Sequence, residues 1–346
     1  MWKYAVRLLG VVLSIMLLVS VASFAAAADT MVVKMAHMWP EKSWPGRSII
    51  MFGNGIEKAT KGRIKFKYYL GGTLYSDYNS VTKSVIDGVQ PFCFMYPPML
   101  AVYDARWNAL GLPGACTGVE HMHRIHYKSK AYQQLNKDYA KKTGTRVLFW
   151  ELLIPYGDIP FNTKRPLVTV EDWKGLKIRV APMDVQKLAV KAFGANPIVM
   201  QTTETLSALS LGTVDGGIIT PGTAMTSWKA EETLSNLTVP YGGWAFNTSM
   251  CGFLVNQKWW DNLPKDLQKA IDDALPGIAK QSQADVDAIN ANLFKKYKSV
   301  AKNKVTYLTE EQTKAWDNLV QTQAMPEVFK KTPGLKVLYE DFKKLK

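Results

Sequence analysis

The sequence is poor in cysteine, because its 346 residues include only Cys93, Cys116 and Cys251. Three widely spaced cysteines cannot all pair with one another, which argues against the disulfide framework that stabilises many small secreted proteins. We therefore expect a fold held together by its apolar core, with at least one cysteine present as a buried free thiol.

Signatures of phosphate, nucleophile and metal chemistry are also missing. The sequence contains no GxxxxGK[ST] phosphate loop, no GxSxG elbow and no HExxH pair. His121, His123 and His126 are close in sequence, but on one helix His121 would point away from the other two, and no cysteine or carboxylate pair completes a metal site. We expect a solvated helix face at these histidines, and a protein without metal, cofactor or catalytic residue.

Long apolar runs are confined to the N-terminal region. The run from Leu8 to Val21 follows Lys3 and Arg7 and precedes three consecutive alanines at 26–28. This order of basic, apolar and small residues is typical of a secretory signal peptide, which we assign to residues 1–28. No later run approaches the ~20 residues that a transmembrane helix needs, so we expect a soluble exported protein.

Acidic residues are outnumbered by basic ones. The formal net charge is +14 at pH 7, and two of these charges belong to the predicted signal peptide. The lysines are scattered, with short clusters such as 330–331 and 343–344, and no recognition helix, RNA-binding aromatic motif or basic arm is present. The sequence therefore predicts no nucleic-acid role, and its positive charge is compatible with an anionic ligand.

What the sequence does contain is a repeated alternation of strand and helix. The first series has strands at 31–36, 63–70 and 92–96 with helices at 48–60 and 76–87, and the second has strands at 176–180, 197–200 and 214–220 with helices at 184–193 and 204–211. Such alternation predicts parallel α/β sheets, and the length of the chain favours two domains. A long strand at 145–153 would link them, and residues 264–298 predict a long helix with one apolar stripe.

One predicted strand contains an arginine, Arg179, that allows two interpretations. The run Leu176-Lys177-Ile178-Arg179-Val180 alternates apolar and basic residues, as a half-buried strand does. On one interpretation, Lys177 and Arg179 share a solvated face of a sheet. On the other, Arg179 points into a cleft, where a guanidinium that cannot lose its proton binds an anion.

The same region carries a resemblance to a known family. The runs VEDWKGLKIRV, FGANPIVM and ETLSALSLGTVDG, between residues 170 and 216, resemble the extracytoplasmic solute receptors of tripartite ATP-independent periplasmic (TRAP) transporters for C4-dicarboxylates and sialic acid. The resemblance implies an α/β fold of two domains with crossing strands, an interdomain ligand and a long bracing helix. We expect domain I at 29–152 plus 245–285, and domain II at 153–244 plus 286–346 with the bracing and C-terminal helices.

The resemblance also implies where a ligand would bind. In this family the arginine of LKIRV binds the ligand carboxylate in a bidentate salt bridge, so Arg179 is expected inside the cleft with its charge left unpaired by the protein. By the same alignment, His37, Tyr96, Thr220 and Trp244 are expected at or near the ligand.

Other family positions are substituted in this sequence. Ile159, Ile219 and Thr202 replace an arginine, an asparagine and a phenylalanine of the sialic-acid receptors. The Glu-Trp pair of the metal-bridged ketoacid receptors is absent near 218–219. We therefore expect a less polar cargo, a small or aromatic monocarboxylate or a sulfonate.

The partners and location follow from the resemblance as well. It implies a monomer in the periplasm that delivers an organic anion to a small and a large membrane subunit. Two alternatives from other classes stay open at this point, namely a secreted α/β hydrolase or lyase that acts on a carboxylate substrate, and an adhesion protein. An enzyme would convert a bound acid, whereas a receptor would release it unchanged.

Overall fold

The first strands of the chain form a parallel pair. The computed structural model describes residues 30–152, 157–227 and 229–345. β1 (Met31–Ala36) pairs in register with β2 (Ile64–Tyr69), and α2 (Trp44–Ala59), which lies between them in the sequence, packs against β2. The Ser43 hydroxyl accepts the Gly46 amide and Pro45 occupies the first turn, so the start of α2 is capped by its own sequence.

A three-stranded sheet completes domain I. Its order is β3–β10–β4, formed by β3 (Phe92–Met95), β10 (Met250–Asn256) and β4 (Thr145–Leu152), and β10 is antiparallel to both neighbours. The alternation of strand and helix predicted parallel pairing, which is wrong for this sheet because β10 returns from domain II. The helices of domain I are α3 (Tyr78–Ile86), α4 (Pro97–Ala101), η1 (Ala105–Gly111), α5 (Val119–Lys128), α6 (Lys130–Thr143) and α11 (Gln257–Asp261).

Domain II is built on a six-stranded sheet in the order β11–β9–β5–β8–β6–β7. Its strands are β5 (Ile159–Asn162), β6 (Lys177–Val180), β7 (Asn196–Val199), β8 (Gly216–Ile219), β9 (Asn236–Val239) and β11 (Lys304–Tyr307). β6 is parallel to β7 and β8, whereas β5 is antiparallel to β8 and β9. The shorter helices are η2 (Glu171–Trp173), α7 (Asp184–Ala192), α8 (Thr202–Ser210), α9 (Pro221–Ser227), α10 (Ala230–Thr233) and η3 (Tyr241–Gly243).

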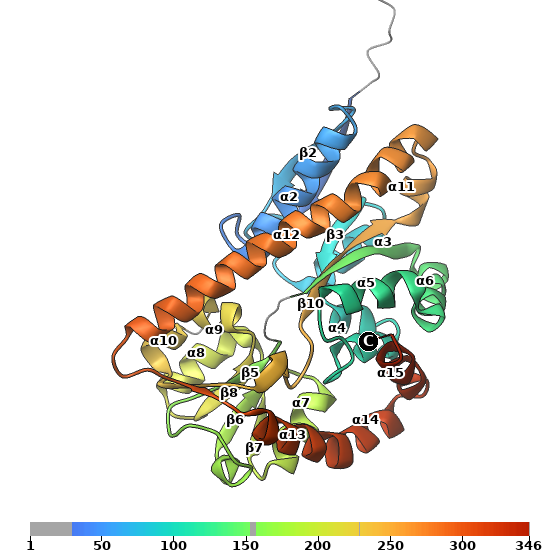
Figure 1. The fold of residues 1–346 in the computed structure, drawn as a ribbon. Coiled ribbons are helices and arrows are strands. Elements are labelled where there is room, and N and C mark those ends of the chain that lie inside the picture. The colour runs from blue at the N-terminus through green and yellow to red at the C-terminus, as the bar shows by residue number, and fades with distance from the viewer. Residues whose placement is uncertain (1–29, 153–156, 228, 346) are drawn as a thin grey trace, which may run out of the picture.

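One helix extends along both domains (Figure 1). α12 (Lys265–Ser299) has 35 residues and is therefore about 50 Å long. Its first half packs on α2 and β4 of domain I, and its second half packs on α9 and α10 of domain II. The predicted bracing helix is confirmed.

Two segments cross between the domains and meet beside β5. One connects β4 to β5 and contains residues 153–156, which lie outside the described residues. The other runs from η3 to β10. The Asp158 amide donates to the Asn247 carbonyl at 3.1 Å, and the Phe246 amide donates to the Asp158 carbonyl at 3.0 Å, so the two segments are hydrogen-bonded to each other.

The C-terminal helices return from domain II to domain I. They are α13 (Glu310–Leu319), the π-helical turn η4 (Val320–Ala324), α14 (Met325–Lys331) and α15 (Leu335–Lys343). α14 and η4 pack on α7 of domain II, whereas α15 packs on η1 and α6 of domain I. By its contacts α15 belongs with domain I, although we grouped it with domain II; the other boundaries stay a prediction.

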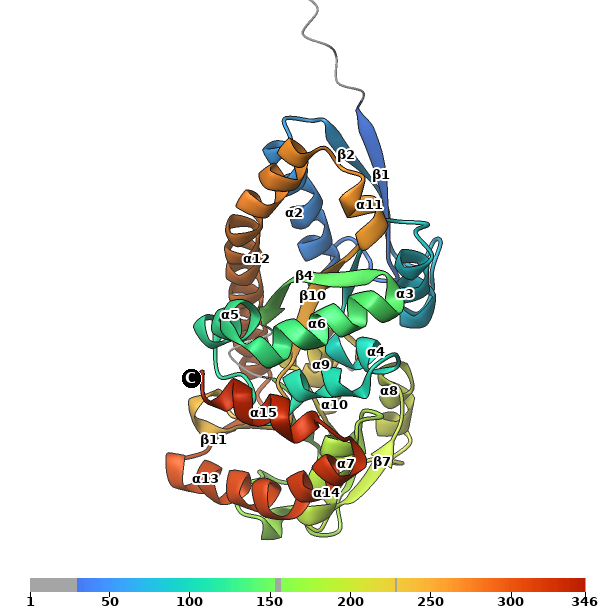
Figure 2. The ribbon, with the colours of Figure 1, turned by 90° about the vertical axis from the view of Figure 1, so that its right-hand side faces the viewer.

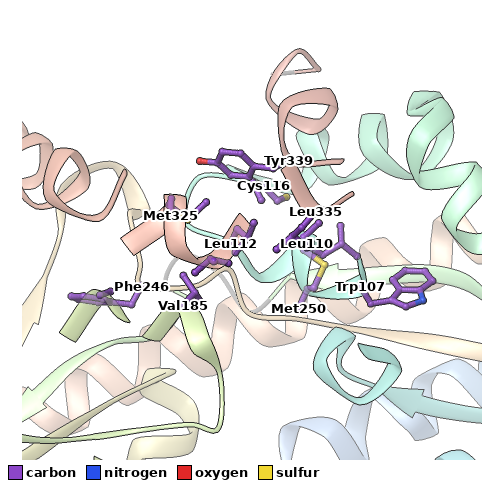
Figure 3. Packing of buried hydrophobic residues seen from close by; sticks show 14 of the residues in the cluster. Trp107, Leu110, Leu112, Cys116, Val185, Phe246, Met250, Met325, Leu335 and Tyr339 are labelled. Atoms are coloured by element: carbon purple, nitrogen blue, oxygen red, sulfur yellow. The ribbon is translucent and has the colours of Figure 1, made fainter. Parts of the chain in front are cut away.

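One apolar cluster spans the two domains and the C-terminal helices (Figure 3). Trp107 and Leu110 come from domain I, Val185 from domain II, Phe246 from the crossing segment before β10, and Tyr339 from α15, and all five are buried in the same cluster. The Tyr339 hydroxyl donates to the Pro113 carbonyl at 2.9 Å, which fixes α15 beside η1. Part of the core is therefore shared between the domains, while two further clusters lie on the domain I side and on the domain II side.

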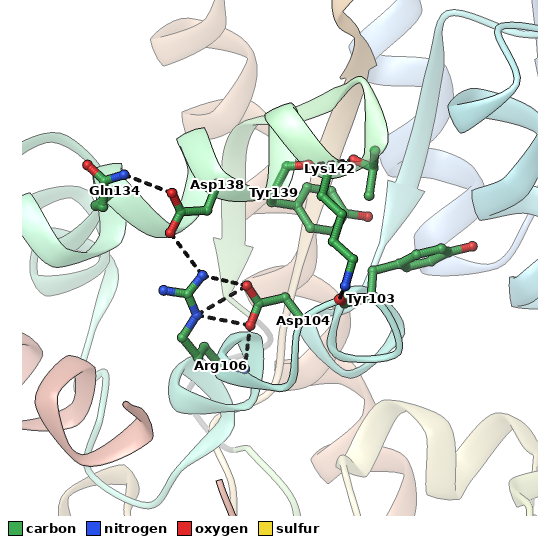
Figure 4. Close-up of polar contacts among 8 residues, drawn as sticks. Tyr103, Asp104, Arg106, Gln134, Asp138, Tyr139 and Lys142 are labelled. Carbon is green, nitrogen blue, oxygen red and sulfur yellow. Dashed lines mark hydrogen bonds and ion pairs between the residues drawn. The ribbon is translucent and has the colours of Figure 1, made fainter. Parts of the chain in front are cut away.

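Polar contacts also hold η1 and α5 in place. Arg106 forms an ion pair with Asp104 at 2.6 Å and with Asp138 of α6 at 2.9 Å (Figure 4). His121, which we expected on a solvated helix face, is only 2% exposed, and its Nε2 lies 2.8 Å from the Phe342 carbonyl. That expectation is wrong for His121 because α15 covers this side of α5.

The three cysteines are all buried and unpaired. This agrees with the expectation of free thiols and an apolar core. In the parts of the chain that the structure describes, no helix combines the length and the apolar character that a membrane span requires.

Candidate functional site

Arg179 lies on β6 in domain II and is buried, with only 2% of its surface exposed. Its partner in the neighbouring strand β8 is Gly217. Because Gly217 has no side chain, the arginine side chain can extend over β8 toward the carboxyl ends of the strands. The interpretation of a solvated sheet face is therefore wrong for Arg179.

The Arg179 guanidinium is oriented by neutral acceptors. Nε donates to the Met200 carbonyl at 3.1 Å, Nη1 to the Ile218 carbonyl at 3.3 Å, and Nη2 to the Thr202 hydroxyl at 3.1 Å. These acceptors lie just beyond β7, on β8 and at the start of α8. They hold the planar group at the edge of the sheet where ligands of open α/β sheets bind.

Two carboxylates act on this arginine. Burial lowers the pKa of Arg179 to about 10, and the negative charges of Asp158 and Glu204 oppose this shift. We expected the protein to leave the charge of Arg179 unpaired, and this expectation is wrong because the guanidinium has both neutral acceptors and nearby carboxylates. Arg179 nevertheless stays protonated at neutral pH.

Asp158 belongs to a buried polar network on the crossing segments. Gln186 Nε2 donates to Asp158 Oδ2 at 2.7 Å and to Asn247 Oδ1 at 2.5 Å, and Gln186 Oε1 accepts the Ala181 amide at 2.8 Å. The network therefore joins both crossing segments to the turn that follows Arg179. Burial raises the pKa of Asp158 to about 6, while Arg179, Gln186, Asn247 and the Thr220 amide act in the opposite direction.

Thr220 lies where the two domains and the bracing helix meet. Its hydroxyl donates to the Thr223 hydroxyl at 2.9 Å. A small cavity is lined by Thr220 and Gly222 of domain II, Trp44 of domain I and Asn290 of α12, together with Val286 and Ile289. The Trp44 ring lies 5.9 Å from the Phe94 ring, which continues this contact into domain I.

His37 is a buried structural histidine at the end of β1. Its Nδ1 accepts the Trp39 amide at 3.2 Å, and its Nε2 lies 2.9 Å from the Phe94 carbonyl, to which it donates as the neutral tautomer. Burial lowers the pKa of His37 to about 4, so the ring is neutral at pH 7. Because backbone groups occupy both ring nitrogens, we do not retain His37 as a polar contact to ligand.

Tyr96 lies in an aromatic group at the carboxyl end of β3. Its ring meets the Tyr78 ring edge to face at 5.5 Å, and the Tyr78 ring meets His37 at 6.1 Å. Burial, followed by the charges of Cys251 and Tyr78, raises the pKa of Tyr96 well above its usual value. Tyr96 thus presents a neutral ring, and Tyr78, which the sequence did not suggest, accompanies it.

A cavity between the domains lies beyond the ends of β3, β6 and β7. The cavity, of about 450 Å³, is lined by Pro98, which follows Tyr96, by Pro182, which follows Arg179, and by Val199 at the end of β7, with residues of α14 and α15 closing it. Neither Tyr96 nor Arg179 lines this cavity itself. It places the ends of β3, β6 and β7 around one interdomain opening.

Three other predicted residues are not presented to an open cleft. Trp244 donates to Asp317 of α13 at 2.9 Å and packs edge to face on Phe246 and Trp316, in the cluster on the other side of the sheet from Arg179. We do not retain it in the site. Ile159 and Ile219 pair across β5 and β8 on the same face as Arg179, but they are buried, at 0% and 6% exposure.

A protein-family model identifies the chain. The model of the bacterial extracellular solute-binding protein family 7, DctP, matches residues 35–332. The chain belongs to this family.

Relatives with assigned ligands match most of the length of this family 7 chain. It is 26% identical over 321 residues to the C4-dicarboxylate-binding periplasmic protein DctP of Rhodobacter capsulatus, with 91% of each chain covered. It is 25% identical over 292 residues to the sialic acid-binding periplasmic protein SiaP of Vibrio cholerae, covering 84% of this chain and 87% of SiaP.

Solved family structures share the fold. A TRAP periplasmic solute-binding protein from Ochrobactrum anthropi superimposes with a TM-score of 0.78 at 22% identity, covering 92% of this chain and 96% of the other. One from Shewanella oneidensis with bound succinate has a TM-score of 0.74 at 20% identity, covering 91% and 99%. Family 7 proteins bind solutes and are not enzymes, so the hydrolase alternative is withdrawn.

Asp158, Gln186, Asn247 and Tyr78 are the residues of the site that the sequence did not indicate. Asp158 and Asn247 could have been suspected only from their position on the predicted crossing segments. Gln186 lies within a helix whose apolar spacing gave no sign that an amide is buried there.

Proposed function

We propose that this family 7 protein is a periplasmic receptor that captures a small organic anion between its domains and delivers it to a TRAP transporter. The observation that carries the proposal is the buried Arg179 guanidinium, held by neutral acceptors at the carboxyl edge of the domain II sheet. An anion there can replace hydrogen bonds to neutral oxygens by charge-assisted ones, which are roughly twice as strong.

The charges around Arg179 favour a monoanion. Asp158 and Glu204 are the two carboxylates that act on the guanidinium among the described residues. A ligand with a second negative charge would be repelled by both, and water would screen this repulsion poorly in a buried site. We therefore expect monocarboxylates or sulfonates to bind better than C4-dicarboxylates, although the Rhodobacter capsulatus relative is named for the latter.

The domain I side favours an apolar body for this monoanion. Tyr96 and Tyr78 contribute neutral rings, and at positions 159 and 219 isoleucines stand on the face of Arg179, where they offer no hydrogen bond to sugar hydroxyls. Each buried hydroxyl without a partner would cost about 1–3 kcal/mol. Sialic and hexuronic acids should therefore bind at least about tenfold more weakly than small aliphatic, aromatic or sulfonated acids.

The remaining parts of the proposal rest on the sequence and the family. Residues 1–28 would act as the export signal, and a small and a large membrane subunit would receive the anion. The receptor would act as a monomer. A two-domain receptor of this kind should become more compact and more stable to heat when the ligand closes it.

A panel of acids tests the proposal. We would screen mono- and dicarboxylates, sulfonates and sugar acids by thermal shift, measure the affinity of each hit by calorimetry, and record small-angle scattering with and without the best one. We expect a monoanion among the tightest ligands, unchanged chemically after release, with a smaller radius in the complex. Turnover of the acid, or identical scattering profiles for every hit, would contradict the receptor model.

A further inference from the structure

A second cavity is lined by residues of α5, α6, β4, α11 and α12. Figure 2 shows α5 and α6 beside β4 in domain I. The volume of the cavity is about 500 Å³. None of the residues that line it belongs to domain II or to the residues around Arg179, Tyr96 or Thr220. The lining residues are His126, Tyr127, Tyr132, Gln133, Asn136, Lys137, Ala140, Arg146, Val147, Leu148, Gln257, Asp272 and Leu275.

Arg146 on β4 is the most distinctive group in this wall. Its guanidinium carbon lies 4.6 Å from the centre of the Trp260 ring, on which it stacks, and the side chain is half-buried. Within the described parts of the chain, the guanidinium makes no hydrogen bond or ion pair, and Asp272 and Asp261 act on it only through their longer-range charges. A partly desolvated arginine held flat by a tryptophan is suited to bind a planar anion.

The other polar side chains of the cavity mostly have partners in the protein. Asn136 exchanges two hydrogen bonds with the Val147 backbone, at 3.0 and 3.2 Å. Gln133 donates to the Tyr127 carbonyl at 2.8 Å, and Gln257 donates to Asp261 at 2.7 Å. Arg146 and Lys137 are therefore the groups left to attract a ligand.

The charges facing Arg146 can be followed around the whole cavity. α6 contributes Lys137 and α12 contributes Asp272, which is exposed, while the exposed Asp261 of α11 acts on Arg146 from outside the lining. From α5, His126 is neutral at pH 7, because burial lowers its pKa to about 4. The lining charge is thus positive, and the exposed Asp272 disfavours a ligand with a second negative charge.

We propose that this cavity is a second binding site, which takes a small monocarboxylate with an apolar or aromatic body. Arg146 recognises the carboxylate, and the rings of Tyr127 and Tyr132 with the side chains of Leu148 and Leu275 enclose the body. A cavity of this size suits a small molecule. The proposal does not depend on the ligand of the interdomain site, because it rests on Arg146 and its own cavity.

The test uses phenylacetate, with phenylacetamide as its neutral analogue, and the full-length protein carrying Arg179→Gln to disable the interdomain site. Calorimetry should detect one phenylacetate per chain with a Kd below about 1 mM. Phenylacetamide should bind at least about tenfold more weakly, since it lacks the charge that Arg146 pairs.

Two further variants in this background assign the binding to the cavity. Arg146→Gln should weaken phenylacetate binding at least about tenfold. Lys141→Gln removes an exposed charge from the same helix α6 outside the cavity, and should leave the affinity unchanged. Arg146→Lys should recover the affinity only in part, because an ammonium group cannot form two parallel hydrogen bonds.

The proposal fails if phenylacetate does not bind up to about 1 mM, or if Arg146→Gln binds as well as its parent. Should Arg146→Gln fail to fold, the comparison of phenylacetate with phenylacetamide decides instead, and equal affinities would overturn the proposal. None of these outcomes bears on the interdomain site, because Arg179→Gln is common to all the samples.

Discussion

The two domains contribute different chemistry to the interdomain site. Domain II carries the charged groups, with a protonated Arg179 beside Asp158 and Glu204. Domain I carries neutral rings, since His37 has its nitrogens occupied by backbone and Tyr96 keeps its proton. We infer that domain II selects ligands by charge and that domain I selects them by shape. Mutations should therefore be able to alter the two kinds of selectivity separately.

Removing the charge from domain II should have the largest effect on ligand binding. Arg179→Gln should weaken anion binding by about 2–5 kcal/mol, because the ligand charge would be buried without a partner. Arg179→Lys should recover only part of this loss, because an ammonium group cannot bind a carboxylate at two points. Calorimetry with the best anion of the panel gives both values, and unchanged affinity in both variants would remove Arg179 from the site.

A change in domain I should instead affect stability. His37→Phe leaves the Trp39 amide and the Phe94 carbonyl without their partner, at about 1–3 kcal/mol for each group. We expect a lower free energy of unfolding in urea and less than about a threefold change in ligand affinity. A large loss of affinity at unchanged stability would show that His37 contacts the ligand after all.

The pH dependence of His37 has a defined sign. Its pKa is about 4 in the folded protein and 6.5 as the ordinary value, so the unfolded chain binds a proton that the folded protein does not. Stability therefore falls as the pH falls from about 6.5 to 4. In His37→Phe this part of the pH dependence should disappear.

Asp158 should make the affinity of domain II for anions depend on pH. Its pKa is about 6 in the folded protein, above the ordinary value of 3.8. Between pH 3.8 and 6 the folded protein therefore binds a proton that the unfolded chain does not. The free energy of unfolding should fall as the pH rises through this range. A bound anion should raise this pKa further, so affinity should fall as the pH rises above 6, by up to about tenfold per unit.

Asp158→Asn is the matched variant for this effect. The amide keeps the size and one acceptor for Gln186 but does not titrate. With a sulfonate ligand, which stays ionised throughout, affinity should become nearly independent of pH between 6 and 8. A slope equal to that of the parent protein would assign the titration to another group.

The smallest effect is expected from the hydroxyl of Tyr96. Tyr96→Phe removes a neutral hydroxyl that interacts with Tyr78 and Cys251, which should cost about 0.5–1.5 kcal/mol of stability. Affinity for an aromatic monoanion should stay nearly constant, because the ring is kept. If calorimetry shows a loss of affinity as large as that of Arg179→Gln, domain I also selects ligands by charge.

Much of the fold could be predicted because its signals are local. The helices and strands between 31 and 96, and again between 177 and 219, were expected from periodicity, within a few residues of their observed ends. β5 and β9 were missed because, unlike the equally short and buried β3 and β8, neither follows a predicted helix that marks it as part of the strand and helix alternation. β10 is antiparallel to its neighbours because the chain returns from the other domain before it forms this strand. No local sequence pattern indicates that return.

The site was less predictable than the fold. Arg179 could be singled out because a charge in an apolar alternation is conspicuous. His37 and Trp244 were expected near the ligand. In the structure, the ring nitrogens of the two residues instead form hydrogen bonds with the Phe94 carbonyl and with Asp317, respectively. Which partner a side chain finds depends on elements far away in the sequence, and for Asp158 that partner is Gln186 on α7.

The shared core has a consequence for how this protein unfolds. Buried residues of domain I, domain II and the C-terminal helices belong to one apolar cluster, and the Tyr339 hydroxyl donates to the Pro113 carbonyl within it. Neither domain can lose its part of this cluster without exposing apolar surface of the other. The two domains should therefore melt together, as one calorimetric transition whose measured enthalpy equals the van't Hoff enthalpy, even though the chain is long enough for two separate ones.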